Sequence, residues 1–451
     1  RQISEMTRRA IKVAGTEPGG PVHVRYPLNL LGEPDVKDTI YPQELFRIPV
    51  EMRPPPELIE RTARLLVEAE HPMLCVGAEV TRAGANEQLI ELAELIGAPV
   101  AQGFSVYGDM PFRHPLFAGF YGLGAPEGLA RTDVFVNLGA PAPGPGLFTS
   151  PVPRKAVKVH ARIEYEEIAN VYPTDIAIAA GMKETVEDLT DAVRSIATES
   201  SLRRLAAPRL AAARERQAHE DEQRRQKAKR YWNASPMSWE RVSAELDRAL
   251  EDDAIVVAEL DYRTPYYWLN FDRGRKWLVG QTTGFALGWG LGASIGVKTA
   301  LPDRQVVALI GDGALLFGQI EALWTASRYD IPTITVVLNN RSYDNERNRI
   351  QNRSPLMSNR ETRDQWKDMT GYLGHPDVDF AGLARSFDIE AATVSKPQEL
   401  ASALKRARAV TREGRPFLID ALIMQLDRRG ERTEQTWYPE ISIAAERKRK
   451  V

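Results

Sequence analysis

VVALIGDGALLFGQIEALWTASRYDIPTITVVLNN, residues 306–340, contains two apolar runs, VVALI and TITVVL, each followed at once by polar residues. A parallel strand that is buried on both faces is a continuous apolar run, and both segments fit that description. The residues between the runs carry apolar positions at helical spacing and predict a helix from about Gly318. The stretch therefore predicts a strand, a glycine-rich turn, a helix and a second parallel strand.

Helix and strand patterns alternate over most of the remaining chain. Residues 2–13 carry apolar positions at helical spacing and predict a helix, and GGPVHVRYP, residues 19–27, predicts a short strand. Between Leu58 and about Val193, apolar runs such as PMLCVG and VFVNLG alternate with helical patterns such as NEQLIELAELIG. A second block, from Ser238 to about Ile423, contains AIVVAEL, QVVALIGDG, TITVVLNN and PFLIDAL. Strands that are separated by helices imply parallel sheets. We therefore predict an α/β protein with doubly wound parallel sheets, flanking helices and two full domains.

A charged, alanine-rich tract joins the two blocks at residues 199–230. It is predicted to be a solvated helix that links the domains. Nucleic-acid binding is the alternative, and it is disfavoured because acidic residues interleave with the basic ones.

The composition narrows the class of protein further. A composition of 43% hydrophobic and 27% charged residues is ordinary for a globular protein, and a length of 451 residues is enough for two or three domains with their own cores. The 59 basic and 61 acidic residues give a net charge of -2, so neither nucleic acid nor a membrane surface is expected as a partner. No apolar stretch reaches the roughly 18 residues of a membrane span. A single cysteine, Cys75, fits a cytoplasmic location, and the start at Arg1 suggests a processed or incomplete polypeptide.

Two polar residues follow the apolar runs of the opening stretch. Asp312 comes directly after one predicted strand and Asn340 after the other, so both are expected at the edge where parallel sheets bind ligands. Both offer the hard oxygen atoms that Mg²⁺ prefers, and Gly311 and Gly313 allow the backbone to approach an anion closely. A plain turn at each position is the alternative, but the spacing and the two strands together favour a metal-bridged diphosphate.

The signature GDG, 25 residues and NN resembles that of thiamine-diphosphate-dependent enzymes. TTGFALGWGLGASIGVK and ALWTASRYDIPTITVVLNN are similar to segments of benzoylformate decarboxylases and of acetohydroxyacid (acetolactate) synthase large subunits. The resemblance implies that Asp312, the side chain of Asn340 and the main-chain carbonyl of Ser342 hold Mg²⁺. It also implies that Gly313 and Ala314 donate backbone hydrogen bonds to the diphosphate, with Gly311 in the same turn. Leu287 would prop the cofactor into a bent shape, unless it is an ordinary core leucine.

The resemblance also assigns an activity. It implies a lyase or carboligase that acts on a 2-oxo acid, with decarboxylation through an enamine intermediate, as in benzoylformate decarboxylases. An acetolactate-synthase-like carboligase and a 2-hydroxyacyl-CoA lyase are the alternatives within the enzyme class. Outside that class, the chain could be a cofactor-binding or structural subunit of a split complex.

The resemblance further divides the chain into domains. The glutamate that contacts N1' of the cofactor belongs, in the family, to a pyrimidine-binding domain that precedes the middle domain, and the resemblance implies that this sequence carries only the end of that domain. The missing part is expected from the same gene product or a companion chain, in a homodimer or homotetramer. The expected ranges are a pyrimidine-domain remnant at 1–34, a linker at 35–56, a middle domain at 57–196, a charged helical linker at 197–236, a diphosphate-binding domain at 237–430 and a tail at 431–451.

Substrate contacts are expected in the segment after the two asparagines. Glu346 lies six residues after Asn340, where some decarboxylases of the family reach the substrate. Arg347 and Arg349 could meet a substrate carboxylate, or could lie on a solvated charged helix. FAD is not expected, because VFVNLGAPAPGPGLF replaces the Arg-Phe-Asp-Asp-Arg type of segment found in flavin-binding synthases of the family.

Overall fold

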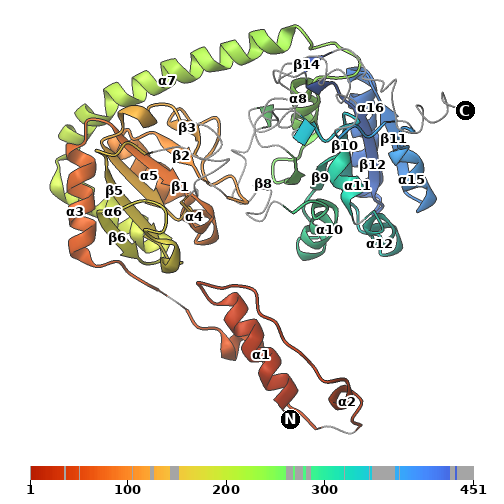
Figure 1. Ribbon diagram of the computed structural model, residues 1–451, viewed down its shortest axis with the longest axis horizontal. Helices are drawn as coiled ribbons and strands as arrows, with labels where there is room; N and C mark the ends of the chain where they lie inside the picture. Colours follow the sequence, from red (N-terminus) through yellow and green to blue (C-terminus); the bar gives the residue numbers. More distant parts are fainter. Residues whose placement is uncertain are drawn as a thin grey trace, which may run out of the picture. The chain divides into compact units, whose positions relative to one another are not determined.

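The computed structural model (Figure 1) describes residues 2–34, 37–49, 51–103, 105–121, 126–142, 152–260, 268–269, 278–280, 286–318, 320–344, 346–347, 371–374, 376–426 and 432–433. Contacts between Cα atoms divide the chain into two compact units. The first unit comprises Arg1–Phe104 and Ala118–Leu210, and the second comprises Ser105–Phe117 and Ala211–Val451. Residues 105–117 thus join the second unit, although they lie inside the predicted middle domain.

The N-terminal segment contains a helix but not the strand that its sequence suggested. Its elements are α1 (Gln2–Gly15), α2 (Leu28–Leu31) and the 3-10 helix η1 (Gln43–Phe46). The apolar spacing of the first residues therefore predicted α1 correctly. Residues 19–27, all of which the structure describes, form no strand. A strand needs a neighbour that completes its hydrogen bonds, and this segment pairs with no other strand.

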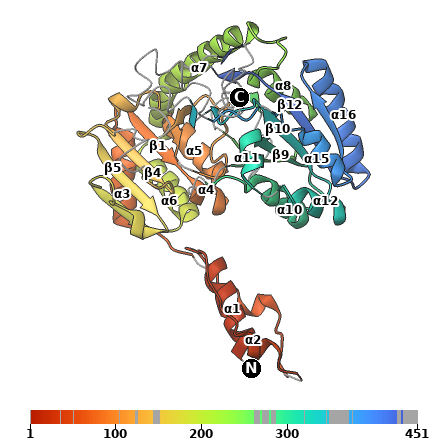
Figure 2. The ribbon, with the colours of Figure 1, turned by 45° about the vertical axis from the view of Figure 1, so that its right-hand side comes forward.

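The first unit is built on a six-stranded sheet with the order β3-β2-β1-β4-β5-β6. Figure 2 shows its strands β1, β4 and β5. Its pairs β1–β2, β1–β4, β4–β5 and β5–β6 are parallel. Strands β1 and β4 are buried along their whole length, as continuous apolar runs require. The strands are β1 (Pro72–Val76), β2 (Val100–Gln102), β3 (Phe117–Phe120), β4 (Val134–Leu138), β5 (Val157–Arg162) and β6 (Ile176–Ala179).

Amphipathic helices accompany this sheet, and both α3 and α5 pack against α6. The helices are α3 (Pro56–Glu68), α4 (Ala78–Arg82), α5 (Asn86–Ile96), α6 (Met182–Ile196) and the 3-10 helices η2 (Leu129–Arg131) and η3 (Tyr165–Glu167). The charged tract forms one helix, α7 (Glu199–Lys229), which continues through Pro208. None of the helices in the described ranges combines the length and the apolar character that a bilayer crossing requires.

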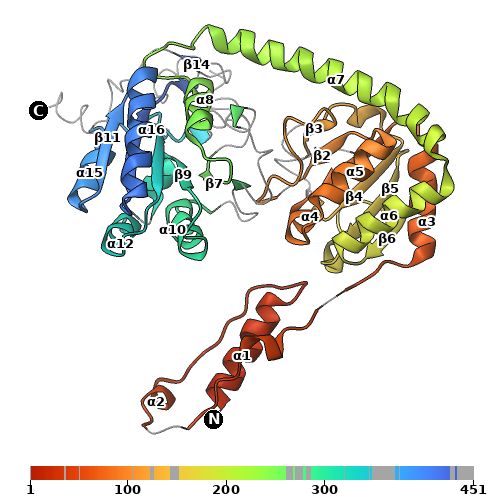
Figure 3. The same cartoon turned by 180° about the vertical axis from the view of Figure 1, so that it is seen from behind.

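The second unit contains another six-stranded sheet, with the order β11-β12-β10-β9-β7-β8, and all neighbouring pairs in it are parallel. Figure 3 shows its strands β7, β9 and β11. The two sheets with their flanking helices confirm the predicted fold class. The strands are β7 (Ile255–Glu259), β8 (Leu278–Val279), β9 (Val306–Gly311), β10 (Ile334–Asn339), β11 (Glu390–Val394) and β12 (Phe417–Leu422), with a separate antiparallel pair of β13 (Gln425–Leu426) and β14 (Arg432–Thr433).

Helices of the second unit include α8 (Trp239–Ala249), α10 (Gly290–Ala300), α11 (Asp312–Phe317), α12 (Ala322–Arg328), α15 (Phe380–Ser386) and α16 (Pro397–Arg412). The helix that was predicted from about Gly318 corresponds to α12, which begins at Ala322, and an additional short helix, α11, begins before it at Asp312. Gly318 ends α11 in an extended conformation, because its φ of 173° breaks the helical geometry. The region between β9 and β10 therefore holds two short helices, and the first starts directly at the end of β9.

Candidate functional site

The carboxyl ends of β7, β9 and β10 meet at the switch point of the second sheet. The chain leaves β7 toward β8 on one side and leaves β9 toward β10 on the other. In open parallel sheets, ligands bind in the crevice where the direction of the connections reverses. Asp312 follows β9 and Asn340 follows β10, so the fold brings both predicted metal ligands to this edge.

The side chains of Asp312 and Asn340 converge on one backbone amide. Ser342 N donates to Asp312 Oδ2 at 3.2 Å and to Asn340 Oδ1 at 2.9 Å. Asp312 is only 3% exposed. This burial raises the pKa of Asp312 to about 7, although the amides of Gly313, Arg341 and Ser342 oppose the shift. Two oxygen atoms from different strands thus point to the same place in a water-poor setting.

The turn after β10 is held by residues that the sequence did not reveal. Arg341 has a φ of 58°, in the left-handed region, and its amide donates to Asn339 Oδ1 at 3.1 Å. Asn339 Nδ2 donates in turn to Asp420 Oδ1 on β12 at 2.9 Å. Gln425 Nε2 donates to the carbonyl of Asn340 at 2.8 Å. Asp420 carried a weak signal, because it is the one polar residue in the apolar run PFLIDAL, whereas Gln425 carried none.

The glycines of the GDG turn differ in their surroundings. A Cβ atom at Gly311 would meet nothing within 4 Å, so space is open beside this residue. At Gly313 a Cβ atom would lie 2.5 Å from Cδ1 of Tyr343, whose hydroxyl donates to the carbonyl of Gly313 at 3.0 Å. The amide of Gly313 donates to Asp312 Oδ1 at 2.8 Å, and Ala314 is buried behind it. The amide of Gly313 must therefore leave Asp312 before it can bind an anion.

Leu287 lies on the loop that precedes α10, and its side chain is 38% exposed, which is unusual for a core leucine. The next residue, Gly288, has a φ of 90°, and a Cβ atom there would lie 3.2 Å from the backbone nitrogen of Gly318. The loop is therefore packed against the end of α11, the helix that starts at Asp312.

Two of the three predicted substrate residues, Glu346 and Arg347, lie in the described part of the chain and differ in exposure. Glu346 is exposed, four residues after Ser342. Arg347 is buried instead, with its guanidinium 3.2 Å from Asp344 Oδ1 and 3.5 Å from Gln425 Oε1. Arg349 lies outside the described residues.

The donor set at the ends of β9 and β10 fits Mg²⁺. The expected ligands are one carboxylate, one carboxamide and one backbone carbonyl, and all of these are the hard oxygen donors that Mg²⁺ takes in proteins. In the described ranges, no group of three or more His, Cys, Asp and Glu side chains is arranged so that it could hold a metal ion, but this donor set needs only one such side chain. Ser342 Oγ is buried without a hydrogen-bond partner in the described part of the chain, and an additional polar group beside it would satisfy it.

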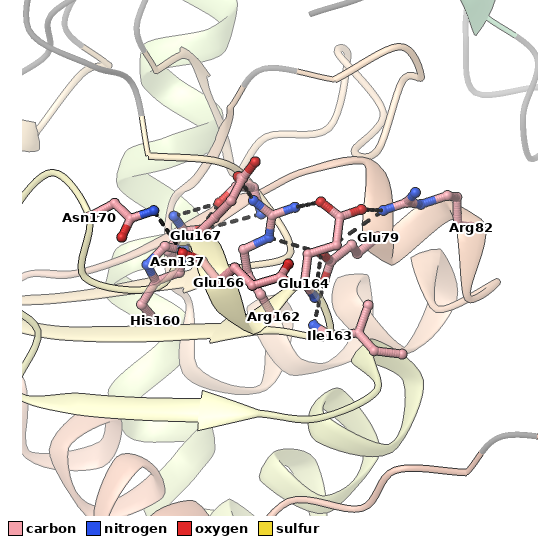
Figure 4. A network of polar contacts seen from close by, with 11 residues as sticks. Glu79, Arg82, Asn137, His160, Arg162, Ile163, Glu164, Glu166, Glu167 and Asn170 are labelled. Atoms are coloured by element: carbon pink, nitrogen blue, oxygen red, sulfur yellow. Dashed lines mark hydrogen bonds and ion pairs between the residues drawn. The ribbon is translucent and has the colours of Figure 1, made fainter. Parts of the chain in front are cut away.

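The first unit has its own polar cluster at the carboxyl end of β5 (Figure 4). Arg162 is buried and donates to Glu79 Oε1 at 2.8 Å, to Glu164 Oε2 at 2.5 Å and to Glu167. Glu79 also accepts from the backbone amide of Ile163 at 2.9 Å. The guanidinium is therefore enclosed by three carboxylates and is already neutralised within this unit.

Comparison with known proteins identifies the family of the chain. Residues 59–189 match the central domain of thiamine pyrophosphate enzymes, and residues 263–421 match their C-terminal TPP-binding domain. Thiamine pyrophosphate is another name for thiamine diphosphate. The chain therefore belongs to the thiamine pyrophosphate enzymes and carries these two domains, which confirms the resemblance seen in its signature. The family is one of enzymes, which favours an enzymatic function over that of a structural subunit.

Individual relatives have different activities. The chain is 28% identical to sulfoacetaldehyde acetyltransferase of Rhodobacter capsulatus over 456 residues, which cover 94% of the chain and 72% of that protein. It is 28% identical to benzoylformate decarboxylase of Pseudomonas aeruginosa over 441 residues, covering 93% and 74%. It is 25% identical to the large subunit of acetolactate synthase isozyme 3 of Escherichia coli over 448 residues, covering 93% and 71%.

The fold is also shared with a solved structure. The thiamine diphosphate-dependent 4-hydroxybenzoylformate decarboxylase of Rhodococcus jostii RHA1 superposes with a TM-score of 0.71 at 24% identity, covering 95% of this chain and 75% of that one. Together these relatives place the chain in the group of decarboxylases, acetolactate synthases and sulfoacetaldehyde acetyltransferases.

Proposed function

We propose that the protein is a Mg²⁺-dependent and thiamine-diphosphate-dependent lyase or carboligase that acts on a 2-oxo acid, with decarboxylation of the benzoylformate type as the first candidate. The observation that carries the metal assignment is the convergence of Asp312 Oδ2 and Asn340 Oδ1 on the amide of Ser342. The carbonyl of Ser342 would complete the protein ligands. A benzoylformate decarboxylase among the relatives favours the choice of substrate.

The residues around the metal ligands would receive the rest of the cofactor. The open space beside Gly311 suits a diphosphate that approaches the backbone closely, and the amides of Gly313 and Ala314 lie in the same turn. The exposed side chain of Leu287 offers an apolar contact to the cofactor rings. When bound, the cofactor supplies an electron sink for the carbon that loses its carboxylate.

Calorimetry tests the binding part of this proposal. Thiamine diphosphate is titrated into the wild-type chain with Mg²⁺ and then with a chelator in place of the metal. We expect binding only with Mg²⁺, and we expect Asp312→Ala to abolish it. Asp303→Ala is the matched control, because Asp303 is an exposed carboxylate of the same unit. Unchanged affinity in Asp312→Ala would remove the metal assignment.

A substrate screen tests the activity. The complete protein is offered a panel of 2-oxo acids, and CO₂ release is measured with and without acceptor aldehydes. Release without an acceptor supports the decarboxylase. Release that depends on an acceptor, or cleavage of a 2-hydroxyacyl-CoA, supports the carboligase or the CoA lyase instead.

We propose that the enzyme works without FAD. Nucleotides in doubly wound domains bind at the carboxyl ends of the strands, and in the first unit this edge carries the buried carboxylate of Glu79. Arg162, the cation that could meet a phosphate there, is held by carboxylates of its own unit. We expect purified protein to be colourless and active without added FAD, and a stoichiometric flavin absorbance would contradict this.

The other half of the cofactor site is proposed to come from outside this chain. Three aromatic side chains are exposed: Phe317 at the end of α11, Trp324 on α12 and Tyr329 just after α12. Arg328 lies over the rings of Trp324 and Tyr329. Exposed apolar groups near a ligand site suit a protein partner. We propose that a pyrimidine-binding domain covers them in a homodimer or homotetramer, where it contributes the N1' glutamate.

Turnover by the isolated chain tests this arrangement. A site that is open to water on the side of the cofactor rings protects its reactive carbon poorly. We therefore expect these 451 residues alone to turn over no 2-oxo acid, and activity to return when the pyrimidine-binding domain is added. Full rates from the isolated chain would show that the proton-relay group lies within it.

A further inference from the structure

A buried glutamate stands at the switch point of the second sheet, beside the candidate metal site. Glu259 is the last residue of β7 and is only 2% exposed. Its partner in the parallel register is Ile310 of β9, two residues before Asp312. The acidic side chain therefore lies on the strand next to the one that carries the metal ligand, but the function described above leaves it without a role.

Both carboxylate oxygens of Glu259 accept hydrogen bonds from backbone amides. Its Oε1 accepts from the amide of Gly288 at 2.5 Å, and its Oε2 accepts from the amide of Gly290 at 2.6 Å. Gly290 is the first residue of α10, so the negative charge also meets the positive end of this helix. A Cβ atom at Gly290 would lie 2.8 Å from Cβ of Glu259, which shows how closely the loop approaches the strand. Glu259 thus ties the start of α10 to the end of β7.

The two hydrogen bonds from the amides of Gly288 and Gly290 fix the backbone directly after Leu287. Leu287 immediately precedes Gly288, and its side chain remains exposed while the backbone after it is held. On its other side, Gly288 packs against the backbone of Gly318 at the end of α11. The loop is therefore held between β7 and α11, while the side chain of Leu287 stays exposed. This arrangement suits the presentation of an apolar group to a ligand rather than the filling of a core.

We propose that Glu259 is a positioning residue for thiamine diphosphate, which fixes the loop before α10 so that Leu287 contacts the rings of the cofactor. This inference rests on the proposed function. Glu259 acts through the amides of Gly288 and Gly290 and does not itself touch the metal or the diphosphate. Loss of the tie should weaken the contact with the rings while the diphosphate and Mg²⁺ contacts remain.

The test compares two ligands by calorimetry with Mg²⁺ present: thiamine diphosphate, which has the rings, and inorganic diphosphate, which lacks them. Glu259→Gln keeps the size of the side chain but turns an amide donor toward the amides of the loop. We expect it to weaken thiamine diphosphate binding about tenfold and to change diphosphate binding less than twofold. Leu287→Ala should give the same pattern, and the double variant should lose little more than either single variant, because both act through one contact.

Controls separate this role from a general loss of structure. Glu245→Gln changes a buried carboxylate on α8 that pairs with Arg241 and Arg248, and it should leave both affinities unchanged. If Glu259→Gln does not fold, Glu259→Asp keeps the charge but is too short to reach both amides, and the same pattern is expected. Wild-type affinity for thiamine diphosphate in a folded Glu259 variant, or equal weakening of both ligands, would overturn the proposal. Failure of the wild-type chain to bind thiamine diphosphate would instead refute the proposed function.

Discussion

Asp312 combines burial with a charge that it must carry in order to bind a metal. Its carboxylate is enclosed, and the raised pKa of about 7 reflects the cost of ionising it there. Metal binding competes with this proton, so the affinity for Mg²⁺ should rise as the pH increases toward and through 7. A buried carboxylate without its cation is thus a source of instability that the cation relieves.

The first prediction concerns Asp312→Asn. Between the unfolded pKa of 3.8 and the folded pKa of about 7, the folded state holds a proton that the unfolded state has lost, so this group makes stability fall as the pH rises. Above pH 7 the full cost of burying the charge remains. We therefore expect the metal-free variant to be more stable than wild type at pH 8 by roughly 1–3 kcal/mol, allowing for one lost hydrogen bond, and equal to it near pH 4.

Urea unfolding at pH 4 and pH 8, with and without Mg²⁺, measures this effect. Magnesium should stabilise wild type and leave Asp312→Asn unchanged. The control Asp303→Asn should follow wild type throughout. A metal-free variant that is less stable than wild type at pH 8 would show that the buried charge is not a cost.

The two glycines of the turn give a matched pair for a second prediction. In Gly313→Ala the new methyl group meets the ring of Tyr343 at 2.5 Å from Cδ1, and the ring is held by its hydroxyl bond to residue 313. We expect a loss of about 1–3 kcal/mol in the free energy of unfolding. In Gly311→Ala the methyl group meets nothing within 4 Å, and stability should change by less than about 0.5 kcal/mol.

The affinity for thiamine diphosphate gives a second measurement on the same pair of glycine variants. Gly311→Ala fills the space proposed for the diphosphate, so it should weaken binding although it folds normally. Wild-type affinity in Gly311→Ala would place the diphosphate elsewhere.

At the scale of helices and strands, one side chain of α7 caps the C-terminal ends of two other helices. Arg209 donates to the carbonyl of Ile96, the last residue of α5, at 2.8 Å and to the carbonyl of Ala69, just after α3, at 2.6 Å. The last carbonyl groups of a helix lack partners within the helix, and a cation there also meets the negative end of the helix dipole. Gly97 lets the chain turn at the end of α5 with a φ of 64°. The charged helix therefore stabilises the first unit through a specific contact.

The third prediction is that Arg209→Ala destabilises the first unit by about 1–3 kcal/mol, because two carbonyl groups lose a charged donor. Arg203→Ala is the control on the same helix, since Arg203 is exposed and pairs with Glu199 on the surface. Such a pair contributes about 0–1 kcal/mol. Urea unfolding of both variants measures the difference, and equal stability of the two variants would refute the capping role.

The same elements show what the sequence could predict. Strands β1, β4, β9, β10 and β12 are buried almost throughout, so each is an apolar run that can be recognised. Strand β8 has two residues and β11 is partly exposed, so neither gives such a run. The segment at 19–27 looked like a strand, because a local pattern does not show whether a neighbouring strand exists.

The residues of the candidate site also divide into those that local sequence predicts and those that it does not. Asp312 and Asn340 could be placed because each comes directly after a recognisable strand. Asp420 supports Asn339 across 81 positions of sequence and Gln425 supports Asn340 across 85, and such contacts depend on the order of strands in the sheet. Glu259 also lies at the end of a recognisable strand, but its partners lie 29 and 31 residues away, in a loop whose position no local pattern defines.

At the scale of the whole molecule, two units with separate cores share one chain. Each unit has its own six-stranded sheet, and the core around Ile310 and Val337 consists of residues of the second unit alone. The candidate site is built entirely from the second unit, since Glu259, Leu287, Asp312, Asn340 and Ser342 all belong to it. Ligand binding should therefore stabilise one unit directly and leave the other to its own interactions.

The last prediction follows from this division. Two units with independent cores do not unfold as one two-state system, so calorimetric melting of the chain should resolve into two transitions. Thiamine diphosphate with Mg²⁺ at 100 times the dissociation constant should stabilise the second unit by about 2.7 kcal/mol and raise only its transition. Arg209→Ala should lower only the other transition, which assigns each peak to its unit. A single cooperative transition that shifts as a whole with ligand would show that the two units unfold together.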